Sequence, residues 1–445
     1  MARQFVLISD AVSPFSKGEA PTGAMGLARG LSSRGAAVTV LSLAAPEILS
    51  ETPGFARRLR TVQVTFADRK RDVALYEGKA QQDHSQLIVA GVTGTTRGES
   101  ALLLGEVFRA LSTEGLKADV AIAWGETAAP ALAASSATVR VFVIPNGRVG
   151  DDLTEAEAAW LGERGFLSGT TSEGRLLSSL GAASANAIVA PSPSSARSLE
   201  RERGLADRAA DEPVVSLRFG CDDYPNDPAH DSSLPATFSS KVAHGKSECR
   251  KAMVRRFSLS ADARTLILGT APLRRNKGGA KVLEALSLLG SLDIAIAIPG
   301  DGDSDLIDQA RRLAIAAPGR WAFLGSGEAE ERFLRAASDA VVFGDKDDRT
   351  GRSSGLAQLY GALPICYEGG AARDYLVDYD PPSRTGGALL FGSDEAHDIV
   401  AAIGRATRLR ADGDSAVTLA EGLMSSAPRW SRCAAAFEEV CAEFS

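Results

Sequence analysis

Histidine and cysteine, the side chains that most often hold transition metals, are scarce in this sequence. It has four histidines and five cysteines among 445 residues. The cysteines are scattered without the spacing of a metal site, and their odd number argues against a disulfide framework and suits a reducing compartment. The sequence therefore offers no metal centre.

Long apolar runs and an excess of positive charge are also missing. The formal net charge is -7, which argues against a surface built for nucleic acid. No stretch reaches the roughly 18 apolar residues of a membrane span, and the first residues enter a strand pattern without a signal-peptide core. We therefore expect a cytoplasmic protein with neither a membrane nor a nucleic acid as partner.

What the sequence does have is the composition of a globular protein, with 44% hydrophobic and 24% charged residues. Its length suits two domains of ordinary size. Short apolar runs alternate with helical patterns along the chain, as in FVLIS (5–9), AVTVLSL (37–43) and RTLILGT (264–270). This alternation predicts an α/β fold with parallel sheets.

The richest stretch runs from Ser338 to Asp374. It contains a strand pattern, a charged loop from Gly344 to Gly355, a helix, a second strand pattern and the turn GGAARD. Loops at the carboxyl ends of parallel strands, followed by helix N-termini, are where open α/β sheets bind anionic ligands. The pattern alone leaves open a simpler alternative, in which these are connecting loops with solvated charges.

This stretch resembles the glycogen/starch synthases, which are retaining glucosyltransferases of the GT-B fold. Aligned without a gap against Glu-x-Cys-Gly-Leu-x-x-x-Tyr-x-x-x-Tyr-Gly-x-Leu-Pro, the chain has Asp348 in place of the family's glutamate. The turn and the segment VDYDP (377–381) also match the family pattern. The motif residues that the chain keeps are Gly351, Tyr360, Gly361, Leu363, Pro364, Gly370 and Asp374.

The resemblance implies two Rossmann-like domains whose parallel sheets face each other across a cleft. Residues 1–243 would form the N-terminal, acceptor-side domain, and residues 244–425 the nucleotide-sugar domain. Residues 426–445 would form a helix that crosses back to the first domain. The Pro/Asp/Ser-rich segment before the first boundary has the composition of a linker.

On the donor side, the resemblance implies that Lys17 and Lys277 hold the diphosphate of a nucleotide-sugar. Pro272 takes the place of the family's arginine, and Arg274 and Arg275 follow it closely. Guanidinium groups can bind phosphate through two hydrogen bonds. For Lys277 a solvated loop lysine is the alternative.

Three further residues complete the implied donor side. Gly370 and Ala371 would open a helix N-terminus toward the donor, and Asp348 would be the catalytic carboxylate. The side chain of Asp348 is one methylene shorter than glutamate, and a shift of about 1 Å can cost on the order of a hundredfold in rate.

On the acceptor side, Trp124 and Glu126 stand where the family has a His-Asp-Trp-His cluster. An aromatic ring and a carboxylate there could stack on a sugar and hydrogen-bond to it, whereas packing is the alternative for the tryptophan. Pro145 takes the place of the histidine that contacts the donor sugar, and proline has no side-chain donor to replace it.

Three functions remain open at this point. The first is a glycosyltransferase that moves glucose from ADP- or UDP-glucose to an α-glucan or related acceptor, with the nucleotide-sugar as substrate and no metal or cofactor. The second is a catalytically weak or inactive relative that binds glucan or nucleotide as a scaffold. The third is a GT-B transferase with a non-glucan acceptor. The sequence does not settle whether the protein is an enzyme, nor its oligomeric state.

Overall fold

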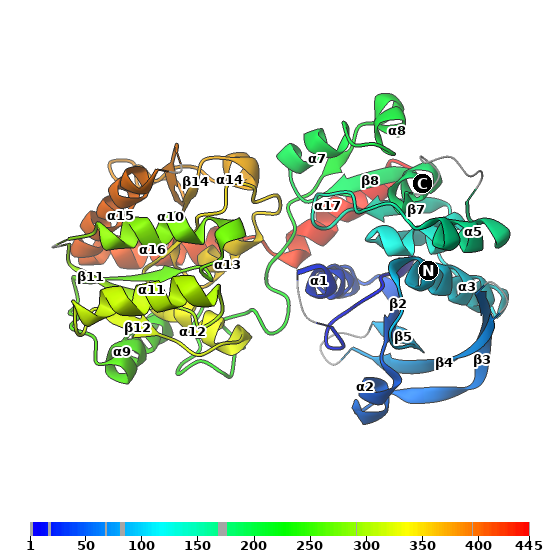
Figure 1. Cartoon of the computed structure of the whole chain (residues 1–445), viewed down its shortest axis with the longest axis horizontal. Coiled ribbons are helices and arrows are strands. Elements are labelled where there is room, and N and C mark those ends of the chain that lie inside the picture. The colour runs from blue at the N-terminus through cyan, green and yellow to red at the C-terminus, as the bar shows by residue number, and fades with distance from the viewer. Residues whose placement is uncertain are drawn as a thin grey trace. The chain divides into compact units, whose positions relative to one another are not determined.

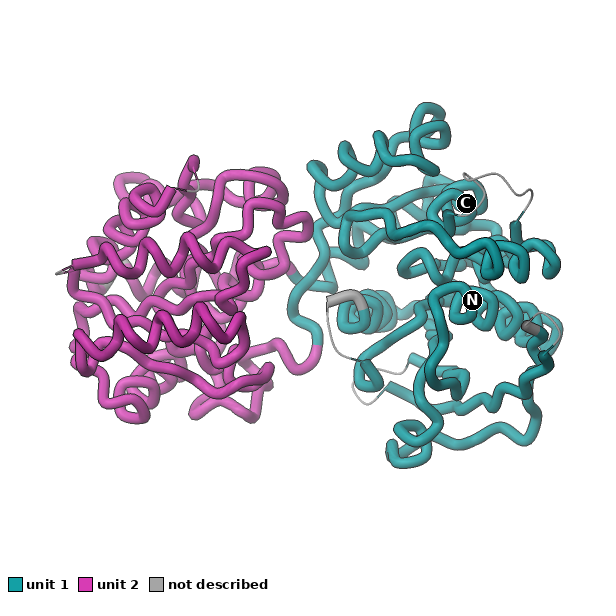
Figure 2. The backbone as a smooth tube through the Cα atoms, viewed as in Figure 1, with its two compact units in different colours: residues 1–223, 429–445 teal, residues 224–428 magenta. Residues whose placement is uncertain are grey.

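The computed structural model describes residues 3–16, 19–66, 69–80, 85–167, 176–290, 292–393 and 395–444. The chain divides into two compact units, coloured separately in Figure 2. Unit 1 comprises Met1–Asp223 with Arg429–Ser445, and unit 2 comprises Tyr224–Pro428. Each unit is built around its own sheet.

Unit 1 contains a nine-stranded sheet in the order β3-β4-β5-β2-β1-β6-β7-β8-β9. Its strands pair in parallel except for β4, which is antiparallel to both β3 and β5. The strands are β1 (Gln4–Ile8), β2 (Ala37–Ala44), β3 (Ala56–Phe66), β4 (Arg69–Lys79), β5 (Gln86–Gly91), β6 (Val120–Trp124), β7 (Val139–Val143), β8 (Ala187–Ala190) and β9 (Val215–Ser216).

Helices cover both faces of this sheet, which is why its central strands are apolar throughout. On β1, Phe5 and Leu7 pack with one core and Val6 and Ile8 with the other, following the period of two in a strand. The helical elements are α1 (Glu19–Ser33), α2 (Pro46–Glu51), α3 (Arg97–Thr113), η1 (Glu126–Ala128), α4 (Ala129–Ala133), α5 (Glu155–Glu163), α6 (Leu177–Ser184), α7 (Pro193–Leu199), α8 (Ala206–Asp211) and α17 (Trp430–Ala442).

The C-terminal helix α17 belongs to unit 1 and packs against α1 (Figure 1). Glycine lets the two helices approach closely, because a Cβ atom on Gly26 would lie 2.2 Å from Nε1 of Trp430. The main-chain N–H of Trp430 donates to Asp222 at 2.7 Å, and its indole N–H donates to Asp223 at 3.2 Å. Helix α17 is thereby fixed at its first residue.

Unit 2 contains a six-stranded, fully parallel sheet in the order β12-β11-β10-β13-β14-β15. The order reverses between β10 and β13, so these two neighbouring strands form the switch point of the sheet. The strands are β10 (Leu266–Thr270), β11 (Ile294–Ile298), β12 (Trp321–Phe323), β13 (Ala340–Val342), β14 (Leu363–Tyr367) and β15 (Leu389–Phe391).

Helices flank this sheet, with α9 packed beside α12, and α15 packed beside α10 and α16 (Figure 1). No helix in the described ranges is long and apolar enough to cross a bilayer. The helical elements are α9 (His244–Phe257), η3 (Arg275–Lys277), α10 (Gly279–Ser287), α11 (Ser304–Ile315), α12 (Glu328–Ala337), α13 (Arg352–Leu359), α14 (Gly370–Tyr375), α15 (Ala396–Ala411) and α16 (Gly413–Ser426).

The segment 224–243, which has the composition of a linker, lies inside unit 2. Asp231 in this segment accepts a hydrogen bond from Nε of Arg332 at 2.7 Å and one from the hydroxyl of Tyr360 at 3.2 Å. All three side chains are buried. A buried ion pair that lost one partner would leave an uncompensated charge, so these contacts fix the segment to unit 2. The division of the chain therefore falls before the boundary expected after residue 243.

Candidate functional site

The carboxyl ends of β10 and β13 carry two loops that touch through their backbones. Gly278 ends the first loop with φ at +71°, and a Cβ atom there would lie 2.0 Å from the main-chain oxygen of Gly344 in the second. Both the positive φ and the close approach require glycine. The glycine after Lys277 therefore allows these two loops to lie in direct contact.

Lys277 connects the same two loops through its side chain. Its ammonium donates to Oδ2 of Asp345 at 2.7 Å. The lysine side chain is 53% exposed, while that of Asp345 is 20% exposed. The cation therefore lies at the surface of the switch point, beside a better-buried carboxylate that the sequence analysis did not single out.

The two arginines of this loop differ in their surroundings. The guanidinium of Arg275 forms an ion pair with Asp305 at the start of α11, and its main-chain N–H donates to Asp303 at 2.8 Å. Arg274 is exposed, and within the described ranges its guanidinium has no hydrogen bond or ion pair. Arg274 is therefore the arginine that can turn to a ligand without breaking an existing pair.

Asp348 shapes the loop that follows β13. Its Oδ1 accepts the main-chain N–H of Gly351 at 2.9 Å and that of Thr350 at 3.1 Å. Burial raises the pKa of the Asp348 carboxyl, and these two backbone hydrogen bonds oppose the rise. One oxygen of the carboxyl group therefore stabilises the turn before α13 by accepting its main-chain hydrogen bonds.

The start of α14 is attached to this loop. The main-chain N–H of Ala371 donates to the main-chain oxygen of Asp348 at 2.9 Å. Gly370 has φ at +53°, and a Cβ atom there would lie 2.3 Å from the same oxygen. The loops after β10, β13 and β14 are thus joined, and they bring together Lys277, Asp348, Gly370 and Ala371. The amide of Ala371 is already used inside the protein.

In unit 1, Lys17 lies outside the described residues. Trp124 is only 2% exposed, and its ring packs 5.2 Å from that of Phe219 and 6.2 Å from that of Trp430, measured between ring centroids. In this structure the ring is a core side chain with no face open to a sugar. The packing alternative therefore describes Trp124.

Glu126 connects three loops at the carboxyl end of the first sheet. It follows β6, forms an ion pair with Arg97 at the start of α3, and accepts the main-chain N–H of Gly150 beyond β7 at 2.9 Å. Burial raises the pKa of the Glu126 carboxyl, while Arg97 opposes this shift. Only 11% of the side chain is exposed. Arg97 is a partner that the sequence analysis did not find.

Comparison with known proteins adds sequence relatives in one family, although no protein-family model matches this chain. Glycogen synthase of Methylocella silvestris is 30% identical over 238 residues, which cover 52% of this chain and 49% of that protein. Glycogen synthase of Granulibacter bethesdensis is 30% identical over 236 residues, covering 51% and 49%. The chain therefore spans about half the length of the curated relatives it matches.

Among solved structures, the catalytic domain of starch synthase IV from Arabidopsis thaliana, bound to ADP and acarbose, has a TM-score of 0.82. It is 18% identical, with 100% of this chain and 99% of that chain covered. HepE of Anabaena in complex with UDP-glucose has a TM-score of 0.59 at 14% identity, with 99% of both chains covered.

The two parallel-sheet units and these structural matches define a protein of the GT-B glycosyltransferase fold. Within that class, about half of the chain is similar in sequence to glycogen synthases. The similarity is incomplete at the motif positions. Pro145, Pro272 and Asp348 stand at positions where the family pattern has a histidine, an arginine and a glutamate.

Proposed function

We propose that this protein is a glycogen/starch synthase-like glycosyltransferase that moves glucose from ADP- or UDP-glucose to an α-glucan or a related acceptor. The observation that supports it best is the joining of the loops after β10, β13 and β14. These loops gather the ammonium of Lys277, the exposed Arg274 and the first turn of α14 at one end of the sheet.

The nucleotide diphosphate is the part of the substrate that this group of residues suits. Its charge needs cations both in the bound substrate and in the leaving group. Lys277 and Arg274 supply two in unit 2. Lys17, which the family resemblance assigns to the diphosphate, lies outside the described residues and stays a prediction. Arg275 contributes only after it leaves Asp305. With these cations the transfer needs no metal or other cofactor in our proposal.

Asp348 is our proposed catalytic carboxylate. Its Oδ1 is held by the turn, so we assign the other oxygen, Oδ2, to the donor sugar. Gly370 and Ala371 act through the orientation of the α14 dipole toward the donor, since the amide of Ala371 is bonded to Asp348. On the acceptor side we retain Glu126 as a hydrogen-bonding group, whereas Trp124 is buried in the core and takes no direct part in our proposal.

Radiolabelled ADP-glucose or UDP-glucose, incubated with the purified protein and glycogen, tests this proposal. We expect label in the glucan, with strong loss in Lys277→Ala and Asp348→Ala. Lys251→Ala, which removes an exposed lysine of α9, is the matched control and should retain activity.

The other outcomes separate the alternatives. Nucleotide binding without turnover would favour a binding or scaffold protein. Label found only in a non-glucan acceptor would favour a transferase with a different acceptor. Full activity in both Lys277→Ala and Asp348→Ala would overturn the site assignment.

A further inference from the structure

A pocket lies at the opposite end of the unit 2 sheet from the candidate donor loops. This pocket of about 180 Å³ is lined by Leu266, Ala340 and Leu363, the first residues of β10, β13 and β14. Residues of α9, α15 and α16, together with the end of α12 and adjoining loop residues, form its other walls. Because parallel strands place their amino ends together, this pocket and the donor loops lie at different ends of the same three strands.

The lining combines an apolar surface with a surplus of positive charge. Among the described side chains that line the pocket, three are cationic and one is anionic: Lys246, Arg250, Arg410 and Asp339. The larger apolar side chains are Leu266, Leu363, Leu409, Val417, Leu419 and Leu423. Such a lining resembles that of a small-molecule site, in which a few polar groups fix the orientation of an apolar body.

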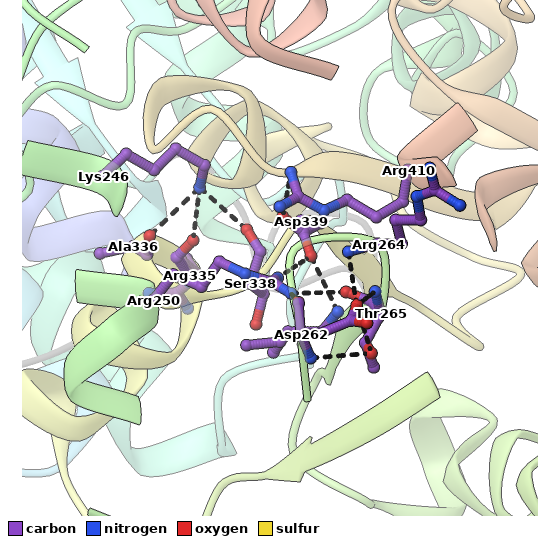
Figure 3. Close-up of polar contacts among 11 residues, drawn as sticks. Lys246, Arg250, Asp262, Arg264, Thr265, Arg335, Ala336, Ser338, Asp339 and Arg410 are labelled. Atoms are coloured by element: carbon purple, nitrogen blue, oxygen red, sulfur yellow. Dashed lines mark hydrogen bonds and ion pairs between the residues drawn. The ribbon is translucent and has the colours of Figure 1, made fainter. Parts of the chain in front are cut away.

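The single carboxylate is already engaged (Figure 3). Asp339 forms an ion pair with Arg250 and accepts the main-chain N–H of Ile267 at 2.8 Å. Arg250 also donates to the main-chain oxygen of Asp262 at 2.9 Å and to that of Thr265. Arg250 and Asp339 therefore satisfy each other inside the wall.

Lys246 is a buried cation whose hydrogen-bond acceptors are neutral. Its ammonium donates to the main-chain oxygens of Ser338 and Tyr360, each at 2.8 Å, and to that of Ala336 at 3.2 Å (Figure 3 draws the bonds to Ser338 and Ala336). Burial lowers the pKa of Lys246 to about 8. Near pH 7 it therefore adds a positive charge that carbonyl dipoles stabilise but do not neutralise.

Arg410 is the least satisfied of the three cations. Its Nη1 lies 3.4 Å from Oδ1 of Asp339, a long contact for an ion pair whose carboxylate is shared with Arg250. Its Nε is buried and, in the part of the chain that the structure describes, has no hydrogen-bond partner. The Arg410 side chain as a whole is 17% exposed, so the terminal nitrogens of its guanidinium, rather than the enclosed Nε, are the donors that can reach an anionic oxygen in the pocket. A further acceptor would offset part of the cost of burying this charge.

We propose that this pocket binds a small organic anion, whose carboxylate or phosphate group accepts a hydrogen bond from Arg410 and whose compact apolar body lies among Leu409, Leu419 and Leu423. The volume sets the size of that body. An engineered apolar cavity of about 150 Å³ holds benzene, so about 180 Å³ suits one ring or a short branched chain. A whole nucleotide-sugar is too large for this space.

Calorimetric titration with benzoate, phenyl phosphate and neutral benzamide tests the proposal. We expect at least one of the two anions to bind, and benzamide to bind at least tenfold more weakly, because it has the shape but not the charge. Comparing the anions separates a carboxylate site from a phosphate site. Absence of binding by both anions at about 10 mM, which corresponds to less than about 3 kcal/mol, would overturn the proposal, as would equal binding of benzamide.

Saturating ADP distinguishes this pocket from the candidate donor loops. We expect ADP to leave the affinity for the anion unchanged. Displacement of the anion by ADP would place it at the donor loops and overturn the proposal. Because the readout is anion binding, failure of glucosyl transfer has no bearing on the result.

Two variants and a matched control locate the anion in the pocket. Arg410→Gln removes the head-group contact, and Ala420→Leu fills the pocket from α16 without changing a charge. We expect each to weaken binding at least tenfold, whereas Arg408→Gln, an exposed arginine on the same helix α15, should bind within twofold of the unmodified protein. Circular dichroism verifies folding. If Arg410→Gln does not fold, Ala420→Leu decides, and undiminished binding in a folded variant of either kind would overturn the proposal.

Discussion

The ammonium of Lys277 and the carboxylate of Asp345 meet at 2.7 Å across two loops that follow neighbouring strands of unit 2. The pair is partly exposed, so its net contribution to stability is small, about 0–1 kcal/mol. A diphosphate that binds here can therefore replace Asp345 as the ion-pair partner of Lys277 at a small cost in free energy. Asp345 also opposes such a ligand, because its own negative charge stays close by.

The first prediction follows from these opposite effects. Lys277→Ala should weaken ADP binding at least tenfold, or about 1.4 kcal/mol, because it removes a charge-assisted hydrogen bond. Asp345→Asn should strengthen ADP binding by roughly twofold to fivefold, since it removes a partly screened repulsion. Calorimetric titration with ADP measures both. Weaker binding in Asp345→Asn would mean that the carboxylate's main task is to position the lysine.

Much of the fold could be predicted from sequence because the central strands are buried on both faces. FVLIS and RTLILGT form short apolar runs, and each contains a strand in the structure, β1 and β10. The prediction of a GT-B fold is confirmed by the two parallel-sheet units and their structural matches. Segment 224–243 shows the limit, because its polar composition gives no sign of the buried ion pair that anchors it.

The site was less accessible to sequence reasoning, because spacing along the chain does not say which loops touch. Asp345 could be recognised as the partner of Lys277 only once β10 and β13 were known to be neighbours. Similarly, the burial of Trp124 depends on Trp430, 306 positions later, which packs against it through α17. The sequence shows the charged loop after β13, but it does not show which residues pair with its charged side chains.

The second prediction compares two adjacent arginines. Arg274→Ala should weaken ADP binding by several fold, whereas Arg275→Ala should change it by less than twofold. The reason is that the Arg275 guanidinium is paired with Asp305, while that of Arg274 is exposed. Each substitution is the control for the other in the same titration. A larger loss in Arg275→Ala would show that this side chain leaves Asp305 when the nucleotide binds.

The third prediction concerns the contact between the loop backbones. Gly278→Ala should lower the free energy of unfolding well beyond the roughly 1–2 kcal/mol of a left-handed alanine, because its Cβ would also lie 2.0 Å from the Gly344 oxygen. Gly290→Ala is the matched control, since its φ is +50° and its nearest atom is 3.9 Å away. Urea unfolding measures both. Equal decreases in the free energy of unfolding for the two variants would indicate that the two loops can move apart at no cost in free energy.

The last prediction uses the buried Lys246. Burial lowers its pKa to about 8 in the folded protein, from 10.5 for the model side chain. Between these two values the unfolded chain binds more protons at this lysine than the folded one, so the free energy of unfolding gains a term that rises with pH. The slope of that term is at most about 1.4 kcal/mol per pH unit.

Urea unfolding at pH 8, 9 and 10 measures this term as the difference between the unmodified protein and Lys246→Met, in which all other titrating groups remain. The unmodified protein should gain stability relative to the variant as the pH rises. Lys251→Met, which removes an exposed lysine of the same helix α9, should follow the unmodified protein instead. A constant difference across the three pH values would show that the four main-chain oxygens around Nζ stabilise the ammonium enough to cancel the effect of burial.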